Sequence, residues 1–559
     1  MLILLALVLI SAALRYPLVE HERLQTDSYT IHYLAKAIEE DAYAKWTFHP
    51  LSYIGYYPLS YPSGTPFILA ELASLTGLSL QVSILLFDIV LSTLFCLAVF
   101  CLARQFIRRP EFFLLATLLA VTGPRFVDTT YWDGSARGPL IVLMTLTVFA
   151  SLRAASTGQS RLLIVAVVTG LGCFALHHMA AMFLLLGAAY VLATIAADYV
   201  APRAGLLARR IVAVYFLAIG SAITVISFGF FEYSQFLAKS MEQAMLFNVE
   251  PKGLSIFLIA GVSYTNQIGF ILIVAIMGIP SILRNHKLTV ATLFPIAVIL
   301  SFIPLLGNTL YVSMVVSPFV SILGTLWLSG LFRNTSRRIL AVFLVVVLCA
   351  ASIALPLWST ARWNTTAQMT GDTVEVGDQI FNDANYLNKF YNDVPAISNA
   401  YVLPQQLAAM SDVKFLRGGI PLALSGYVSA DDMKDNVTFM HDTFPRDLLT
   451  WYKYENEPAV DMYVLGLMVH GTSILSSYGD FSLKTRQLFS ANRNLVVVVD
   501  NNWPEEYVHV YGILYANFPA ELRYANWHSG SESPLNFLPS YQSYQSERIT
   551  LFMVEMPVG

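Results

Sequence analysis

The chain has 559 residues, of which 56% are hydrophobic and 13% charged, and its formal net charge is −4. Soluble globular domains carry roughly 25% charged residues, so this composition, with a mean hydropathy of +0.60, excludes a water-soluble globular protein. The net charge is weak and no cluster of Lys and Arg is interleaved with aromatic residues, which excludes a nucleic-acid-binding protein. We therefore expect membrane lipids to surround most of the chain.

Apolar runs long enough to cross a bilayer fill the first two thirds of the chain. A transmembrane helix needs about 20 predominantly apolar residues, and somewhat shorter runs suffice where the flanking loops dip toward the bilayer. Eleven runs qualify, near residues 1–19, 80–103, 110–124, 138–152, 162–178, 179–200, 211–230, 266–283, 288–306, 310–332 and 339–359. The pattern predicts a mainly α-helical polytopic membrane domain over residues 1–360, with about 11 transmembrane helices.

Basic residues set the expected orientation of these helices. Short cytoplasmic loops of membrane proteins carry an excess of Lys and Arg. Here 13 of the 21 basic residues of the membrane domain fall in five alternate connections. They are Arg104, Arg108, Arg109, Arg153, Arg161, Arg203, Arg209, Arg210, Arg284, Lys287, Arg333, Arg337 and Arg338. We therefore expect a cytoplasmic N-terminus and an extracytoplasmic segment beyond residue 360.

The C-terminal segment, residues 361–559, differs in character from the rest. It holds 12 basic and 22 acidic residues. Short apolar runs rich in β-branched residues alternate with amphipathic stretches, which is typical of an α/β domain. The expected strands lie at 395–398, 462–466, 495–500 and 549–554, and the expected helices at 378–391 and 446–454. Phosphate-binding and zinc-binding motifs are absent from this sequence segment, so we expect a lid or recognition domain.

The first external loop, about residues 20–66, is too long to be a simple connector. Asp27 stands near its start, before an aromatic-rich helical run, and a Tyr- and Pro-rich stretch with Tyr57 and Tyr61 follows. The amphipathic run 67–75 comes next. By itself, Asp27 is equally well interpreted as a helix N-cap or as a reactive carboxylate.

The next external loop carries charges of both signs, at Arg125, Asp128, Asp133 and Arg137. This order of pieces resembles the GT-C superfamily of membrane glycosyltransferases. The closest likeness is to the oligosaccharyltransferase catalytic subunit and to related archaeal and bacterial enzymes that use polyprenyl-phosphate-linked sugars. Those enzymes combine a first external loop with an early acidic residue, a Tyr-Pro-rich stretch, an apolar helix and a second acidic loop.

Two features depart from the oligosaccharyltransferase pattern. The two aspartates of the second loop are five residues apart and do not form a D-x-D motif, and the acceptor-recognition motif WWDYG is absent from the C-terminal segment. The nearest string, at residues 451–455, keeps two of five positions. The resemblance therefore implies an acceptor that is a glycan, a lipid or a protein, without the peptide sequon as a requirement.

The resemblance also implies roles for individual residues. Asp27 would act on the acceptor nucleophile while a sugar leaves a polyprenyl phosphate, such as dolichyl phosphate, on the outer face of the membrane. The charge of the leaving phosphate would be stabilised by Arg125 and Arg137, or by a divalent cation, Mg²⁺ or Mn²⁺, held by Asp128 and Asp133.

Two further features each have two interpretations, and a third has one. His177 and His178, at the outer end of the fifth run, would ligate a metal or the donor phosphate, or bond backbone and water as a structural pair. Glu232, in the outer loop at 231–265, would belong to a mobile substrate-covering loop or to a solvated helix. Asp88, inside the second run, is expected to pair with a neighbouring helix.

Two other classes of protein share this composition. A transporter places ionisable residues near the bilayer midplane and often shows inverted repeats, whereas these carboxylates cluster in the outer loops. A non-catalytic sensor or assembly protein with a ligand-binding C-terminal segment leaves the acidic, aromatic first loop unexplained. We therefore expect an integral membrane glycosyltransferase of a prokaryotic plasma membrane, archaeal or bacterial.

Overall fold

The computed structural model contains two compact units, each built from two parts of the chain. One unit comprises Met1–Leu18 and Ile84–Thr366, and the other comprises Val19–Ser83 and Ala367–Gly559. The structure describes residues 2–17, 22, 28–42, 47–48, 56–57, 63–200, 254–285, 289–302, 305, 309–370, 378–391, 394, 396–398, 403–413, 494–500, 540–546 and 549–555. Asp27, Tyr61, Glu232 and the predicted elements at 211–230, 446–454 and 462–466 lie outside these residues.

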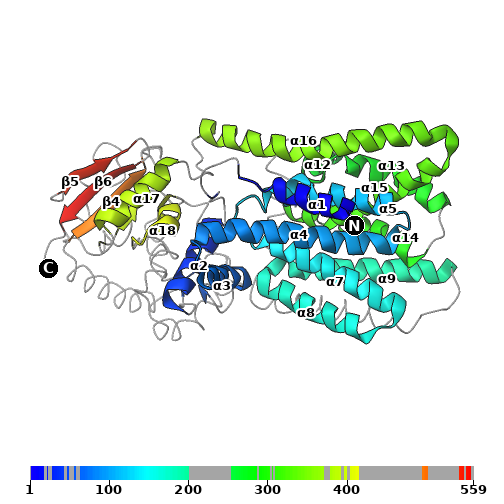
Figure 1. Ribbon diagram of the computed structural model, residues 1–559, viewed down its shortest axis with the longest axis horizontal. Coiled ribbons are helices and arrows are strands. Elements are labelled where there is room, and N and C mark those ends of the chain that lie inside the picture. The colour runs from blue at the N-terminus through cyan, green and yellow to red at the C-terminus, as the bar shows by residue number, and fades with distance from the viewer. Residues whose placement is uncertain are drawn as a thin grey trace. The chain divides into compact units, whose positions relative to one another are not determined.

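The first unit is a bundle of apolar helices (Figure 1). Its helices are α1 (Leu2–Ala13), α4 (Leu80–Phe106), α5 (Pro110–Val121), α6 (Pro124–Asp128), α7 (Arg137–Thr157), α8 (Ser160–Leu176), η1 (His178–Met182), α9 (Phe183–Val200), α12 (Leu254–Ile268), α13 (Ile271–Asn285), α14 (Val290–Ser301), α15 (Thr309–Arg333), η3 (Thr335–Arg337) and α16 (Arg338–Thr370). The α4 helix begins four residues before the unit boundary.

Several of these helices meet the requirements for crossing a membrane. Within the part of the chain that the structure describes, five helices are long and apolar enough, or six if the bent pair Gly261–Ile268 and Ile271–Leu283 is one span. Shorter apolar helices are Leu2–Ala13, Pro110–Val121, Ser160–Leu176 and Val290–Ser301. The prediction of a mainly helical membrane protein is confirmed.

The run predicted as one helix at 266–283 is instead broken. The break lies near the start of the run, between Ile268 and Ile271, and the segments Gly261–Ile268 and Ile271–Leu283 are bent by 110°. Gly269, between α12 and α13, has φ +98°, and its N–H donates to the carbonyl of Thr265 at 2.8 Å. A glycine in this conformation ends a helix because residues with a Cβ rarely adopt positive φ. The hydropathy of the run did not reveal the bend.

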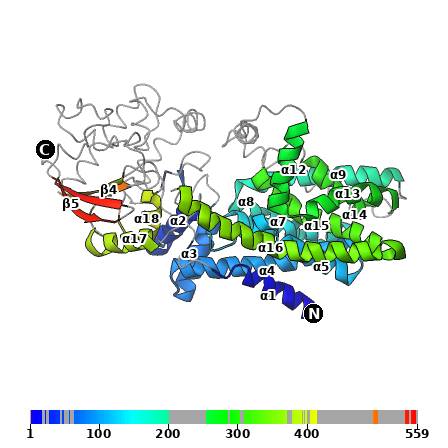
Figure 2. The same ribbon diagram turned by 90° about the horizontal axis from the view of Figure 1, so that it is seen from above.

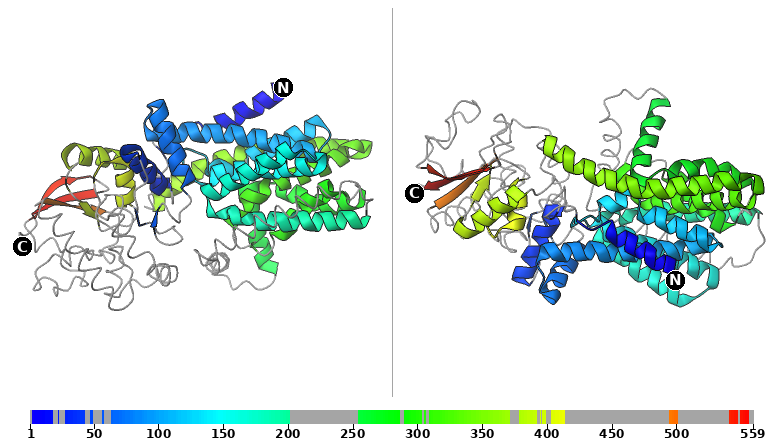
Figure 3. Two further views of the ribbon diagram at one scale, coloured as in Figure 1. Left: turned by 90° about the horizontal axis from the view of Figure 1, so that it is seen from below. Right: turned by 45° about the horizontal axis from the view of Figure 1, so that its top comes forward.

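Small residues bring α13 and α15 into close contact. A Cβ added to Gly278 of α13 would lie 2.6 Å from Cβ of Trp327 on α15, and one added to Gly324 of α15 would meet Ile271. Most of α15 is buried within the bundle, whereas α16 exposes apolar side chains such as Ile339 and Phe343. In Figure 1 and in the right-hand view of Figure 3, α16 runs along one edge of the bundle, and in Figure 2 it lies in front of other bundle helices. This is the packing expected where lipid covers one helix and protein surrounds another.

The second unit contains a mixed sheet covered by helices. Its elements are α2 (Ser28–Asp41), β1 (Thr47–Phe48), β2 (Tyr56–Tyr57), α3 (Gly64–Thr76), α17 (Asp378–Tyr391), β3 (Ala396–Ser398), α18 (Leu403–Met410), β4 (Asn494–Asp500), β5 (Ser540–Gln545) and β6 (Ile549–Glu555). The sheet order is β3-β4-β6-β5, with β3 parallel to β4 and the other pairs antiparallel. The amphipathic α17 buries Ala384 and Leu387 in one cluster with Val496 and Leu551 of the sheet.

The first long loop folds together with the C-terminal segment. Tyr29 of α2 belongs to the same buried cluster as α17 and the sheet. Lys36 of α2 donates to the carbonyl of Ser411 at 2.8 Å and pairs with the carboxylate of Asp412 at 2.5 Å. The loop that carries Asp27 in sequence is therefore joined to the C-terminal segment through its helix α2.

Candidate functional site

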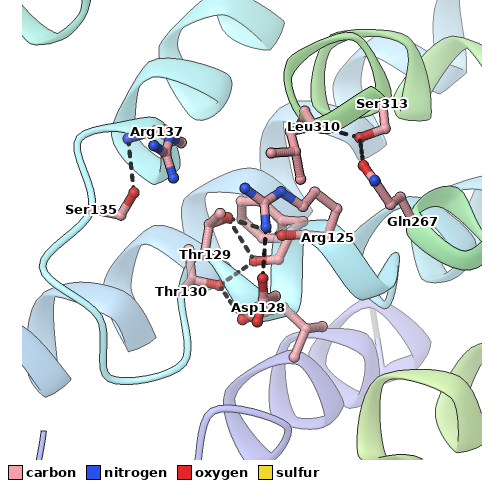
Figure 4. Close-up of polar contacts among 11 residues, drawn as sticks. Arg125, Asp128, Thr129, Thr130, Ser135, Arg137, Gln267, Leu310 and Ser313 are labelled. Carbon is pink, nitrogen blue, oxygen red and sulfur yellow. Dashed lines mark hydrogen bonds and ion pairs between the residues drawn. The ribbon is translucent and has the colours of Figure 1, made fainter. Parts of the chain in front are cut away.

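The loop between α5 and α7 carries four of the charged residues that the sequence analysis selected. Gly123 and Pro124 end the α5 segment and start the one-turn helix α6, because Pro is well tolerated at the first helical position. Within α6, Arg125 and Asp128 are three residues apart and so share one face. Arg125 Nη1 lies 2.7 Å from Asp128 Oδ2 (Figure 4), and the two side chains are only 13% and 14% exposed.

Arg125 stands in an unusual electrostatic environment. Burial lowers the pKa of its guanidinium, the carboxylate of Asp128 raises it, and the positive charge of Arg137 lowers it again. Its Nε is buried and has no hydrogen-bond partner among the described residues. Arg125 thus experiences the positive charge of Arg137 while its own side chain is only 13% exposed. An anion with several acceptor oxygens would relieve that repulsion.

Arg137 opens α7 beside residues from two other helices. Its N–H donates to Ser135 Oγ at 3.3 Å, and its guanidinium carbon lies 5.3 Å from the ring centre of Tyr311 on α15. The ring of His177, between α8 and η1, is 6.3 Å from the same tyrosine. The stretch from α6 to α7 and part of its polar surroundings are drawn in Figure 4.

The hydrogen bonding of His177 fixes its tautomer. The N–H of Met179 donates to His177 Nδ1 at 3.0 Å, so Nδ1 must be the unprotonated nitrogen. A neutral ring then carries its proton on Nε2 and offers a donor there. The bond from the backbone of Met179 to Nδ1 is the kind of contact that the structural interpretation expects. The side chain of His178 is outside the described residues.

Asp133 is held through its backbone. Its N–H donates to Asp88 Oδ2 at 2.9 Å, and its carboxylate interacts electrostatically with Arg125. Asp88, which was expected to pair with a neighbouring helix, accepts this hydrogen bond from the loop. The structure therefore brings Arg125, Asp128, Asp133 and Arg137 to one region.

A metal held by Asp128 and Asp133 does not fit this arrangement well. The carboxylate of Asp128 is already neutralised by Arg125, and no group of three His, Cys, Asp or Glu side chains clusters among the residues that the structure describes. Because Mg²⁺ is commonly held by one or two carboxylates with phosphate oxygens and water, the ion pair of Asp128, and not the number of ligands, is the observation against it. In the described part of the site, the positive charge that could stabilise a phosphate comes from Arg125 and Arg137.

Tyr311 was not predicted from the sequence, and the side chains of some predicted site residues lie outside the part of the chain that the structure describes. Tyr311 lies in a helix otherwise typical of a membrane span, so only its contact with Arg137 marks it. The backbone of Tyr57 pairs with that of Thr47 between β2 and β1, but its side chain is not described. Asp27, which lies outside the described residues, directly precedes Ser28, the first residue of α2.

Comparison with known proteins supports the resemblance seen in the sequence. A family described as dolichyl-phosphate-mannose-protein mannosyltransferases matches residues 60–225. No curated protein matches the chain in sequence.

Solved structures match the fold over nearly the whole chain. ArnT from Cupriavidus metallidurans bound to undecaprenyl phosphate has 12% identity and a TM-score of 0.53, covering 98% of this chain and 97% of ArnT. The oligosaccharyltransferase AglB from Archaeoglobus fulgidus, in complex with an inhibitory peptide and a dolichol-phosphate, has 12% identity and a TM-score of 0.54, covering 99% and 74%. The A. fulgidus oligosaccharyltransferase with Zn and sulfate has 13% identity and a TM-score of 0.51, covering 89% and 68%. The predicted resemblance to GT-C glycosyltransferases is thus confirmed at the level of the fold.

Proposed function

We propose that this chain is an integral membrane glycosyltransferase that transfers a sugar from a polyprenyl-phosphate-linked donor to a glycan, lipid or protein acceptor. The observation that carries the proposal is the pair Arg125 and Arg137 in the α5–α7 loop of a GT-C-like fold. The side chain of Arg125 is only 13% exposed and experiences the positive charge of Arg137, whose guanidinium lies beside Tyr311. Such a site suits a phosphate that becomes more negative as its sugar departs.

The reaction requires one bond to form and one to break at the anomeric carbon of the sugar. A hydroxyl oxygen of the acceptor attacks that carbon, and the bond from the carbon to the phosphate oxygen breaks and leaves its electron pair on the phosphate. The acceptor proton passes to a base, for which we propose Asp27. Arg125 and Arg137 stabilise the departing phosphate through charge-assisted hydrogen bonds, and the Nε2–H of His177 is a candidate third donor.

The relatives suggest the chemical class of the donor. AglB has been solved with a dolichol-phosphate and ArnT with undecaprenyl phosphate, and the matching family is named for a dolichyl-phosphate-mannose donor. We propose the same class, a sugar on a polyprenyl phosphate, for this chain. An oligosaccharyltransferase structure contains Zn, but the ion pair of Asp128 argues for arginine rather than metal charge here, and we propose no step that involves a cation.

We further propose the finer features of the architecture. Ten of the eleven predicted runs coincide with apolar helices or with the bent pair, which supports eleven spans with the run 211–230 as the remaining one. An odd number of spans, with the basic connections inside, puts the N-terminus in the cytoplasm and an α/β domain beyond residue 360 outside a prokaryotic plasma membrane. We propose Glu232, Tyr57 and Tyr61 as residues of the substrate-contacting loops.

A transfer assay tests the function. The purified protein in liposomes is mixed with radiolabelled polyprenyl-phosphate sugars and with acceptors extracted from membranes. We expect label to leave the lipid donor and appear in an acceptor fraction only when the protein is present. Transport of a labelled sugar across the liposome membrane without covalent transfer would instead indicate a transporter.

A further inference from the structure

A second charged cluster lies beneath the proposed site. The side chain of Arg15, just after α1, is fully buried. Its Nε donates to Thr130 Oγ1 at 3.0 Å, and its Nη1 donates to the carbonyl of Ser11 at 3.0 Å. Its guanidinium also lies 4.9 Å from the ring centre of Phe126. A buried cation is costly unless a negative charge accompanies it.

Asp88 of α4 supplies that negative charge. It is 1% exposed, and its charge acts on Arg15. The same carboxylate accepts the N–H of Asp133 at 2.9 Å. Arg15 and Asp88 therefore connect α1 and α4 to both sides of one turn, because Arg15 holds Thr130 and Asp88 holds Asp133. The proposed sugar transfer uses neither side chain.

The turn that these residues hold is strained. Trp132, immediately before Asp133, has φ 50°, which is rare for a bulky side chain. Such a conformation is unfavourable and persists only when the surroundings impose it. The packing around the turn is tight as well. A Cβ added to Gly138 would lie 3.0 Å from Cγ2 of Thr130 and 3.2 Å from Cδ1 of Leu91.

We propose that Arg15 and Asp88 are positioning residues for the sugar transfer, a role that rests on the proposed function. The buried pair holds the strained turn at Trp132, and the turn sets where Asp133 and Arg137 stand relative to Arg125. Loss of the Asp88 acceptor lets the turn relax, so Arg137 moves away from the donor phosphate although the bundle remains folded.

Two matched double variants separate positioning from charge balance. Both carry Arg15→Met, which removes the cation, and they differ only in Asp88→Asn or Asp88→Leu. Asn and Leu have the same number of side-chain heavy atoms and the same branch at Cγ, but only Asn offers an oxygen to the N–H of Asp133. We expect similar unfolding temperatures for the two proteins, and a kcat/KM for the donor at least tenfold lower in the Leu variant. Hydrogen exchange of the peptide covering 129–136 should be faster in the Leu variant than in the Asn variant.

Equal kcat/KM values in the two variants would overturn the proposal and leave Arg15 and Asp88 a purely structural role, whatever their hydrogen exchange. If the Leu variant does not fold, Arg15→Met with Asp88→Ala takes its place, because Ala also lacks an acceptor and cannot overfill the site. Absence of transfer by the wild-type protein would refute the proposed function. The hydrogen exchange of 129–136 would then still report whether Asp88 holds the turn, which keeps the two failures distinct.

Discussion

Replacing Arg125 by methionine should reduce sugar transfer far more than replacing its partner Asp128 by asparagine. The 2.7 Å separation of Nη1 and Oδ2 corresponds to a gross attraction of about 6 kcal/mol at an effective dielectric constant of about 20. Desolvation offsets part of this attraction, and removing one partner of a buried pair typically costs about 3–5 kcal/mol. Because both side chains are slightly exposed, we expect the lower end of that range for either variant.

The effects on transfer should differ. Arg125→Met removes a charge-assisted hydrogen bond to the leaving phosphate, which is worth about 1.5–3 kcal/mol. A loss of this size lowers the transfer rate roughly 10- to 150-fold. Asp128→Asn keeps the guanidinium in place and retains an amide oxygen to hold it, so transfer should stay within about threefold of wild type.

The measurement is the rate of label transfer from a radiolabelled polyprenyl-phosphate sugar. Each rate is divided by the folded fraction and taken well below the unfolding temperature of both variants. If Asp128→Asn lowers the corrected rate as much as Arg125→Met does, Arg125 has no special relation to the phosphate and the reasoning fails.

Three further predictions address the donor, the topology and the first loop. Arg137→Lys keeps the positive charge but loses the planar set of N–H groups. The KM for the lipid-linked sugar should therefore rise several-fold while the protein is still expressed. A destabilised protein with an unchanged KM would show that Arg137 has a purely structural role. An impermeant thiol reagent should label Lys389→Cys in intact cells and Arg337→Cys only after lysis, and the reverse pattern would invert the proposed topology. Burial raises the pKa of the Glu22 carboxyl, which lies 2.6 Å from His32 Nδ1. Between the ordinary glutamate pKa and this raised pKa, the folded protein therefore keeps a proton on Glu22 that the unfolded chain loses. The free energy of unfolding should consequently decrease as the pH rises through that interval. Glu22→Gln should flatten that dependence in thermal unfolding between pH 4 and 8, and an unaltered slope would show that Glu22 does not cause it.

The bundle could be predicted because the length of an apolar run is local information. The same holds for α17 and β4, whose patterns of apolar residues give their boundaries almost to the residue. In contrast, β5 has the sequence SYQSYQ, which lacks aliphatic residues, and becomes a strand by pairing with β6. Tertiary pairing of this kind overrides weak local propensity.

The charged residues of the candidate site could be selected from the sequence, but the sequence did not predict all of the contacts between them. The three-residue spacing of Arg125 and Asp128 would have indicated their ion pair once a helical turn was assigned to Pro124–Asp128. The contacts of Arg137 with Tyr311, and of Arg15 with Asp88 and Thr130, join helices far apart in the chain. The grouping of the first long loop with the C-terminal segment likewise depends on contacts such as Lys36 with Asp412.

The central claim, that this chain transfers a sugar with Asp27 as the base and the arginines of the α5–α7 loop on the leaving phosphate, is tested most directly by the radiolabel assay on Asp27→Asn. Asparagine is itself a good helix N-cap, so a purely structural aspartate predicts transfer close to that of wild type. A catalytic base contributes about 10²- to 10⁴-fold. We predict a folded variant that still binds the lipid-linked sugar and transfers it at least about 100-fold more slowly. Transfer within about threefold of wild type would contradict the assignment of Asp27 as the base.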